Sequence, residues 1–187
     1  MADINMTAKT ATAGRAERPT GGSAPADAAG EPIWDIIELL FFAYRDFVGD
    51  PDEVLSKLGF GRAHHRVLHF VNRNPGMKVA DLLDVLKITK QSLGRVLKQL
   101  VDNGFIEQKE GENDRRQRLL YATPKGEALA LKLAGLQGSR IARALAELGP
   151  GTREDARRFL TAMIDPGARA DVLRLIDRAT RARLARR

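Results

Sequence analysis

The 187-residue sequence contains no cysteine. This absence excludes disulfide bonds, thiolate metal ligands, a cysteine nucleophile and a cysteine redox switch. Long apolar runs are also missing, since no stretch approaches the roughly 18 consecutive apolar residues that a membrane-spanning helix needs. The N-terminal stretch MADINMTAKTATAGRAERP lacks the apolar core of a secretory signal. We therefore expect a cytoplasmic protein without a membrane partner.

Residue sets for catalysis are not found either. The sequence offers no nucleophile with a base, no phosphate-binding loop and no carboxylate pair in an apolar frame. We therefore expect neither an enzyme nor a bound cofactor. His65 and His69 lie four positions apart on one helix face, beside His64, and this spacing suits two ligands of one metal ion. Because no third ligand lies nearby, ordinary structural histidines are the favoured interpretation, and metal or anionic effector binding is the alternative.

Positive charge is what the sequence has in excess. Its 31 Lys and Arg residues exceed its 24 Asp and Glu residues, which gives a formal net charge of +7. Residues 87–118 have eight basic and five acidic side chains, and residues 169–187 have seven basic and two acidic ones. Clustered cations indicate a polyanionic partner, either nucleic acid or an anionic membrane surface. An ordinary solvated face is the alternative.

The N-terminal part of the chain divides into an arm and a helix. Residues 1–31 are rich in small and polar residues without apolar periodicity, and this composition predicts a disordered arm. Residues 32–58 contain a helix and a linker. The helix is apolar nearly all round between residues 33 and 48, so it needs cover on more than one side, and a partner subunit is a natural cover. Gly49-Asp50-Pro51 is expected to end it.

Residues 59–123 have the layout of a helix-turn-helix unit followed by a β-hairpin. Three amphipathic helices and two short strands are expected, at 62–73, 79–86, 89–103, 105–109 and 118–123. Thr89 is suited to cap the third helix, whose outer face is cationic. The pattern predicts a mainly α fold with a small β-hairpin wing, a winged helix-turn-helix DNA-binding domain.

Residues 124–187 are predicted to form C-terminal dimerisation helices. Thr123 with Pro124 is typical of a helix start and opens a long helix to Leu148. Thr152 with Asp155 resembles a capping box for a second helix, which is expected to bury its apolar residues Ala156, Phe159, Leu160 and Met163. A last, basic helix follows Asp165-Pro166-Gly167.

The candidate DNA-binding residues lie on the outer face of the third helix and at the tip of the hairpin. On the helix they are Thr89, Lys90, Gln91, Ser92, Arg95 and Lys98, whose side chains suit base edges and phosphates. At the tip they are Asp114, Arg115 and Arg116. Paired arginines on a loop suit phosphates or a narrow minor groove, and Asp114 is placed to hold Arg116 extended. A solvated polar turn is the alternative for the tip.

Residues from about 60 to 130 resemble the MarR family of winged helix-turn-helix regulators. The resemblance is carried by ITKQSLGRVLKQLVDNGFIEQ at 88–108 and by NDRRQRLLYATPKGEAL at 113–129. It implies that Arg95 contacts DNA from the major groove and that Arg116, oriented by Asp114, enters the minor groove. It also implies a homodimer formed by the N- and C-terminal helices, and a small-molecule effector is a further candidate partner.

These expectations together predict a sequence-specific regulator that binds double-stranded DNA. A two-fold dimer places two recognition helices on one face of DNA, so the operator is expected to be pseudo-palindromic. The alternative function is a winged-helix module for protein–protein interaction, which would not need Arg95 or the arginines of the hairpin tip.

Overall fold

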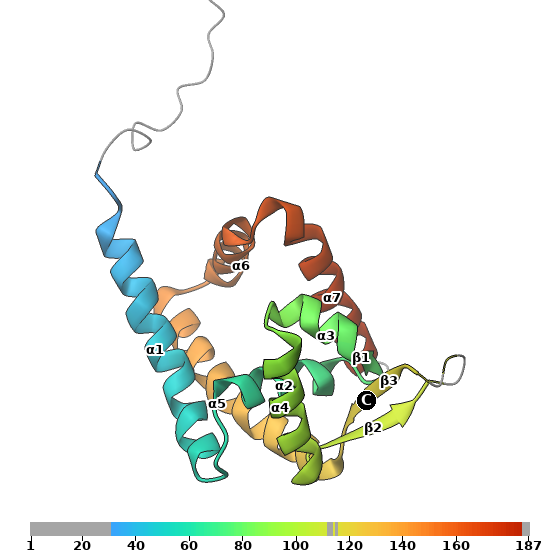
Figure 1. Ribbon diagram of the computed structural model, residues 1–187. Coiled ribbons are helices and arrows are strands. Elements are labelled where there is room, and N and C mark those ends of the chain that lie inside the picture. Colours follow the sequence, from blue (N-terminus) through green and yellow to red (C-terminus); the bar gives the residue numbers. More distant parts are fainter. Residues whose placement is uncertain (1–30, 112–113, 115, 185–187) are drawn as a thin grey trace, which may run out of the picture.

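The structure is a computed structural model that describes residues 31–111, 114 and 116–184. Within these residues the chain forms seven helices and three short strands (Figure 1). In chain order they are α1 Trp34–Ser56, α2 Arg62–Arg73, β1 Met77–Lys78, α3 Val79–Leu86, α4 Lys90–Asp102, β2 Ile106–Glu110, β3 Arg118–Ala122, α5 Pro124–Leu148, α6 Thr152–Met163 and α7 Pro166–Leu184. The predicted fold class is confirmed. Apart from Glu31, the predicted arm lies outside the described residues.

None of the helices in the described ranges is long and apolar enough to cross a membrane.

The wing belongs to a three-stranded antiparallel sheet in the order β1-β3-β2. The hairpin of β2 and β3 was expected from the sequence, but β1 was not. β1 has only two residues, too few for an alternating pattern, and its strand character comes from pairing Met77 with Leu120 and Lys78 with Leu119. This pairing fixes the root of the wing to the start of α3.

The hydrophobic core lies between α2, α3, α4, the sheet and the first half of α5. Its fully buried side chains include Leu68, Leu82, Leu93, Leu100, Leu120 and Leu133. At the start of α5, Thr123 accepts a hydrogen bond from the backbone N–H of Gly126 at 3.1 Å, as its predicted capping role requires. A Cβ on Gly126 would lie 1.9 Å from the carbonyl oxygen of Phe105, so only glycine permits this close approach.

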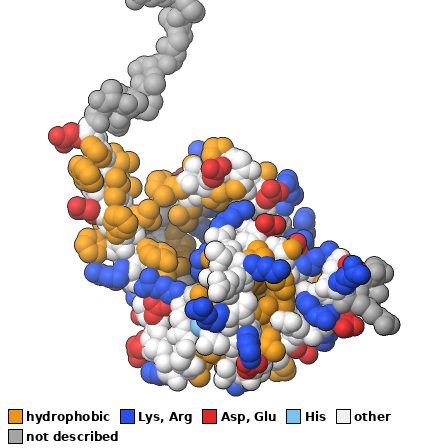
Figure 2. Space-filling model, viewed as in Figure 1, with side chains coloured by type: hydrophobic (Ala, Val, Ile, Leu, Met, Phe, Trp, Pro, Cys, Tyr) orange, Lys and Arg blue, Asp and Glu red, His pale blue; other side chains and the backbone are white. Residues whose placement is uncertain are grey.

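A second group of apolar side chains lies on the surface of the single chain. Figure 2 shows them gathered over α1. They include Trp34, Phe41 and Phe42 on α1, with exposed fractions of 59%, 69% and 54%. The expectation that α6 buries its apolar residues is wrong for the single chain, because no residue of α6 is buried. Within residues 31–111, 114 and 116–184, no other element covers these side chains.

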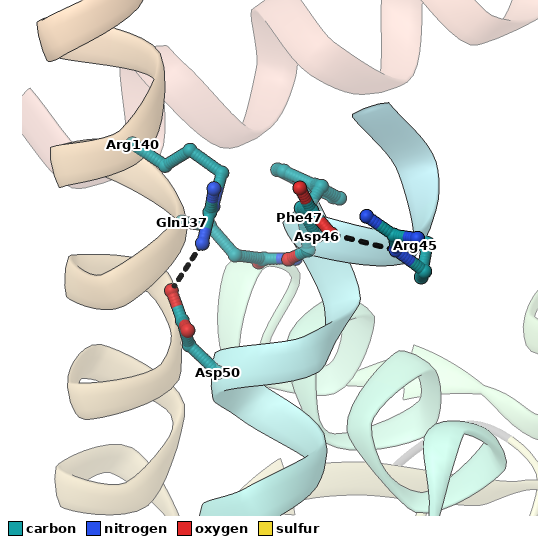
Figure 3. A network of polar contacts seen from close by, with 6 residues as sticks. All are labelled: Arg45, Asp46, Phe47, Asp50, Gln137 and Arg140. Carbon is teal, nitrogen blue, oxygen red and sulfur yellow. Dashed lines mark hydrogen bonds and ion pairs between the residues drawn. The ribbon is translucent and has the colours of Figure 1, made fainter. Parts of the chain in front are cut away.

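Helix α1 does not end where Gly49-Asp50-Pro51 predicted, because it continues through Pro51 to Ser56. Proline has no N–H, so it leaves the carbonyl of Phe47, four residues earlier, without its helical donor. The side-chain amide of Gln137 on α5 donates to that carbonyl at 3.5 Å, and Arg140 forms an ion pair with Asp50 at 3.0 Å (Figure 3). These contacts from α5 allow the helix to pass through the proline.

The C-terminal helices also start differently from the expectation. The predicted capping box at Thr152 is wrong, since Gly151 is the N-cap of α6 and the hydroxyl of Thr152 donates to the carbonyl of Leu148 at 3.2 Å. Helix α7 then folds back towards the winged-helix unit (Figure 1). It docks on α2 through the buried Ala179 and a 3.2 Å hydrogen bond from Arg73 to Thr180.

Candidate DNA-binding interface and ligand cavity

Helix α4 separates an apolar face from a polar one. Leu93, Val96, Leu97 and Leu100 are buried, whereas all of the predicted contact residues are exposed: Thr89, Lys90, Gln91, Ser92, Arg95 and Lys98. The structure thus brings the six candidates together on one accessible face.

One of the six, Thr89, also caps the helix by bonding to another, Ser92. Thr89 is the N-cap of α4, as predicted, and its Oγ1 accepts from the backbone N–H of Ser92 at 3.2 Å and donates to the Ser92 Oγ at 3.0 Å. These bonds use part of the hydrogen-bonding capacity of both hydroxyls, so the first role of Thr89 and Ser92 is to fix the residue at which α4 begins. Because the start of α4 is fixed, the orientation of its exposed face is fixed as well.

The cations of this face differ in their local partners. Lys98 forms an ion pair with Asp102, 2.5 Å away on the same helix. Within the described residues, Lys90 and Arg95 form no ion pair or side-chain hydrogen bond. Gly94 lies beside Arg95, and nothing lies within 4 Å of the place where its Cβ would be. Packing inside the chain therefore does not require glycine there, and an incoming surface has free access to that stretch of backbone.

The wing tip is organised by Asp114. Its carboxylate accepts hydrogen bonds from the backbone N–H of Arg116 at 2.9 Å and from the side-chain amide of Gln117 at 3.3 Å. Asp114 was expected to hold Arg116 extended, and the contact it makes with Arg116 is to the backbone N–H, which fixes the turn. The side chain of Arg116 is exposed and ready to reach outwards. Arg115 lies outside the described residues.

His64 joins the start of α2 to α4, a role that sequence reasoning missed. Its Nδ1 accepts from the backbone N–H of Gly61 at 3.1 Å, while Nε2 lies 2.7 Å from Oε1 of Gln99 on α4. Its ring stacks on Phe60, with ring centroids 4.6 Å apart. Because Nδ1 accepts, Nε2 is the donor to Gln99. The only sequence signal is position, since the third residue of a helix often reaches back to the N-cap.

A cavity of about 410 Å³ lies between α1, α2 and α5. Aromatic and cationic side chains line it: Tyr44, Phe47, Arg62, His65, Arg66, His69 and Phe70, with Val48 and Gln137. Burial lowers the pKa of both His65 and His69 below the ordinary value of 6.5. The charges of His65 and Arg73 lower the pKa of the more buried His69 further. Two histidines on one face were expected, and the structure places them in the wall of this cavity.

No group of three His, Asp or Glu side chains in the described ranges is arranged to hold a metal ion.

Arg66 connects the cavity with the helix-turn-helix unit. It lines the cavity, and its Nη2 also donates to the carbonyl of Leu86 at 3.0 Å. Leu86 ends α3, and Lys87 directly after it adopts a left-handed conformation with φ of 51°. One guanidinium therefore lies both in the cavity wall and at the turn that leads to α4.

Comparison with known proteins agrees with this geometry. The MarR family model matches residues 58–117. The HTH-type transcriptional regulator PetP of Rhodobacter capsulatus is 47% identical over 133 residues, which cover 71% of this chain and 80% of PetP. FabT of Streptococcus pneumoniae, solved in complex with DNA, has a TM-score of 0.63 and 16% identity over 71% of this chain and 94% of its own.

The MarR family protein Rv2887 of Mycobacterium tuberculosis, solved in complex with p-aminosalicylic acid, has a TM-score of 0.51 and 23% identity. That match covers 72% of this chain and 100% of the Rv2887 chain. The family resemblance seen in the sequence is thus confirmed. The chain belongs to the MarR family, and it is a DNA-binding transcriptional regulator of the winged helix-turn-helix class.

Proposed function

We propose that this regulator acts in the cytoplasm as a homodimer that binds a pseudo-palindromic operator, with α4 in the major groove and the wing in the minor groove. The observation that carries the proposal is the outer face of α4, where cations and hydroxyl and amide groups are all exposed on a helix fixed by a buried core. A helix of this width fits the major groove of B-DNA.

The homodimer is supported by the apolar surface of α1. Residues from Ile33 to Tyr44 are all exposed in the single chain, and most of them are large and hydrophobic. A contiguous apolar surface of this kind marks an interaction site in a water-soluble protein. A second copy of the chain covers it and presents a second α4, which accounts for the two half-sites of the operator.

The proposed DNA contacts divide by position. Lys90, Gln91 and Arg95 face outwards and are assigned to base edges or phosphates, with Arg95 as the principal base contact. Thr89 and Ser92 lie at the start of the helix and are assigned to DNA phosphates. The other proposed contacts are Lys98, Arg115 and Arg116, with Asp114 shaping the turn.

Genome-wide occupancy mapping followed by gel-shift assays on the fragments found tests this function. We expect retarded complexes on fragments with two similar half-sites whose centres are about 10 base pairs apart, or a multiple of that distance. A footprint on a single half-site would contradict the dimeric arrangement. Absence of any retarded complex would favour the protein–protein interaction module instead.

We also propose that the cavity binds an anionic aromatic effector. Arg62 and Arg66 supply positive charge, and Tyr44, Phe47 and Phe70 supply aromatic surface. An anion that attracts the guanidinium of Arg66 competes with its hydrogen bond to Leu86, and the turn before α4 then loses a support. Effector binding is thereby linked to DNA affinity through one side chain.

Salicylate and p-aminosalicylate are suitable probes. We expect either compound to weaken the DNA complex of the wild type and to have less effect on an Arg62→Gln variant, with Lys132→Gln on the exposed side of α5 as the charge-matched control. Equal responses of both variants and the wild type would exclude the cavity as the site of action.

A further inference from the structure

The last helix has a basic surface that the contacts of α4 and the wing do not use. We propose that Arg178 and Arg181 of α7 bind DNA phosphates beside the half-site, so that α7 forms a third DNA contact of each subunit. This inference rests on the proposed function, because it assigns a further surface to the same DNA complex.

The position of α7 is fixed by its docking on the winged-helix unit. Ala179 is 5% exposed, and Thr180 next to it accepts a hydrogen bond from Arg73 at the end of α2. The C-terminal half of α7 therefore lies beside β1, which pairs with β3 at the root of the wing (Figure 1). Arg178 and Arg181 are neighbours of Ala179 and Thr180 in sequence, so the docking of α7 on α2 also fixes where these arginines lie.

Arg178 lies next to the wing root and the start of the helix-turn-helix unit. Together with Arg73, Asn74, Met77 and Asp81 it lines a groove of about 280 Å³ between α7, β1 and the start of α3. Arg181 follows three residues later, so it lies on the same side of the helix. Lys78 of β1 is also exposed there and pairs in register with Leu119 of the wing strand β3. The cations of α7 thus extend those of the wing root.

These two arginines are available for an external anion. Both are exposed, and within the described residues neither forms an ion pair or a side-chain hydrogen bond. By contrast, Arg174 on the preceding turn is paired with Asp171. Phosphate binding by Arg178 and Arg181 would break no ion pair in the described part of the chain, and charge-assisted bonds from guanidinium groups to phosphate are among the stronger hydrogen bonds in proteins.

DNA is the partner favoured by this placement. Residues 169–187 have seven basic and two acidic side chains, which suits a polyanion. In Figure 2, Lys and Arg side chains occupy the face over α4 and continue to the side where the wing root and α7 lie. We expect a duplex bound to α4 and the wing to run past the groove that Arg178 lines with β1 and the start of α3, so that the DNA backbone is the anion that this surface meets.

The test compares an R178A/R181A variant with the wild type on a random-sequence duplex of about 30 base pairs, roughly three helical turns. We expect affinity to fall about tenfold and the slope of log affinity against log salt to become shallower by about 2 to 4, because up to two phosphate contacts disappear from each of two subunits. An R153A/R157A variant is the matched control, since it removes two exposed arginines from α6, far from the wing root.

Equal salt slopes for R178A/R181A and R153A/R157A would overturn the inference. A change of the dimer mass in R178A/R181A would also overturn it, because the arginines would then serve the subunit interface. An R178K/R181K variant keeps the charge and should retain most of the affinity, which separates phosphate binding from a packing role. If the wild type itself bound no duplex, the proposed function would fail rather than the role of α7.

Discussion

The winged-helix unit and the helices that flank it differ in where their apolar side chains lie. In the first, Leu68, Leu93 and Leu120 are at most 1% exposed, and the core is closed within one chain. In the second, Phe41 and Leu148 are 69% and 70% exposed. The first region is therefore a finished fold, whereas the second needs another surface before its apolar residues are covered. We therefore expect the first region to hold the main DNA contacts and the exposed apolar surface of the second to assemble the subunits.

The largest effect on DNA affinity is expected from a substitution that disrupts the proposed homodimer and leaves the fold of the subunit intact. Phe41→Glu places a charge in the exposed apolar surface of α1, so we expect a folded monomer. DNA affinity should fall by a factor on the order of 10² to 10⁴, since two linked half-site contacts become one. Sedimentation gives the mass, and gel-shift titration gives the affinity. Leu58→Glu makes a similar change at a 44% exposed position beyond α1, and it should leave the dimer intact.

The second prediction breaks the closed core instead. Gly126→Ala introduces a methyl group 1.9 Å from the carbonyl oxygen of Phe105, so α5 must shift away from the sheet. We expect the free energy of unfolding to fall by about 1 to 3 kcal/mol. Gly135→Ala, on the same helix but facing open space, should raise it by roughly 0.5 to 1 kcal/mol. Urea denaturation of both variants measures the contrast, and equal stabilities would contradict the packing described at Gly126.

Features that depend on contacts between residues close in sequence could be predicted, whereas features that depend on contacts between distant residues could not. Thr89 and Thr123 cap their helices as predicted because each bonds to a backbone N–H three residues away. The continuation of α1 through Pro51 was not predictable, because the side chain that compensates is Gln137, on another helix. The link between His64 and Gln99 was missed for the same reason, since nothing near either residue in the sequence indicates its partner.

The candidate DNA-binding face was largely accessible from the sequence. The alternation of buried leucines and polar residues on α4 fixes the outer face without any knowledge of distant contacts. The turn at Asp114 was less accessible, since a carboxylate two residues before an arginine can bond either to its side chain or to its backbone. The role that we propose for α7 depends on where Ala179 docks, and a basic amphipathic pattern does not specify that place.

The third prediction separates two contributions within the winged-helix unit. Arg95→Ala should cost roughly 1 to 3 kcal/mol on the operator and should reduce the preference for operator over random DNA. Arg116→Ala should weaken binding to both kinds of DNA and make the salt slope shallower by about one for each phosphate that a subunit no longer binds. Fluorescence anisotropy at several salt concentrations gives both quantities. An unchanged slope for folded Arg116→Ala would show that the wing does not touch DNA.

The smallest effect concerns pH and the cavity between the two regions. Burial holds the pKa of His65 and His69 below 6.5, so the unfolded chain binds more protons than the folded one near that pH. Stability should therefore be greatest above about pH 6.5 and should decline as the pH falls below it, until the folded protein also takes up protons. Thermal unfolding between about pH 5 and 8 measures this decline. It should be shallower in His65→Gln/His69→Gln, and an identical profile would exclude these histidines as its source.

The hydrogen bond by which Gln137 compensates for Pro51 links the substitutions that the two positions can tolerate. The amide of Gln137 has a special value only while residue 51 is proline, because any other residue there would supply its own N–H to the carbonyl of Phe47. Loss of Gln137 is therefore expected to be harmful in the native background and nearly neutral after Pro51→Ala. The two positions form an epistatic pair, and substitutions at them in related chains should occur in that order.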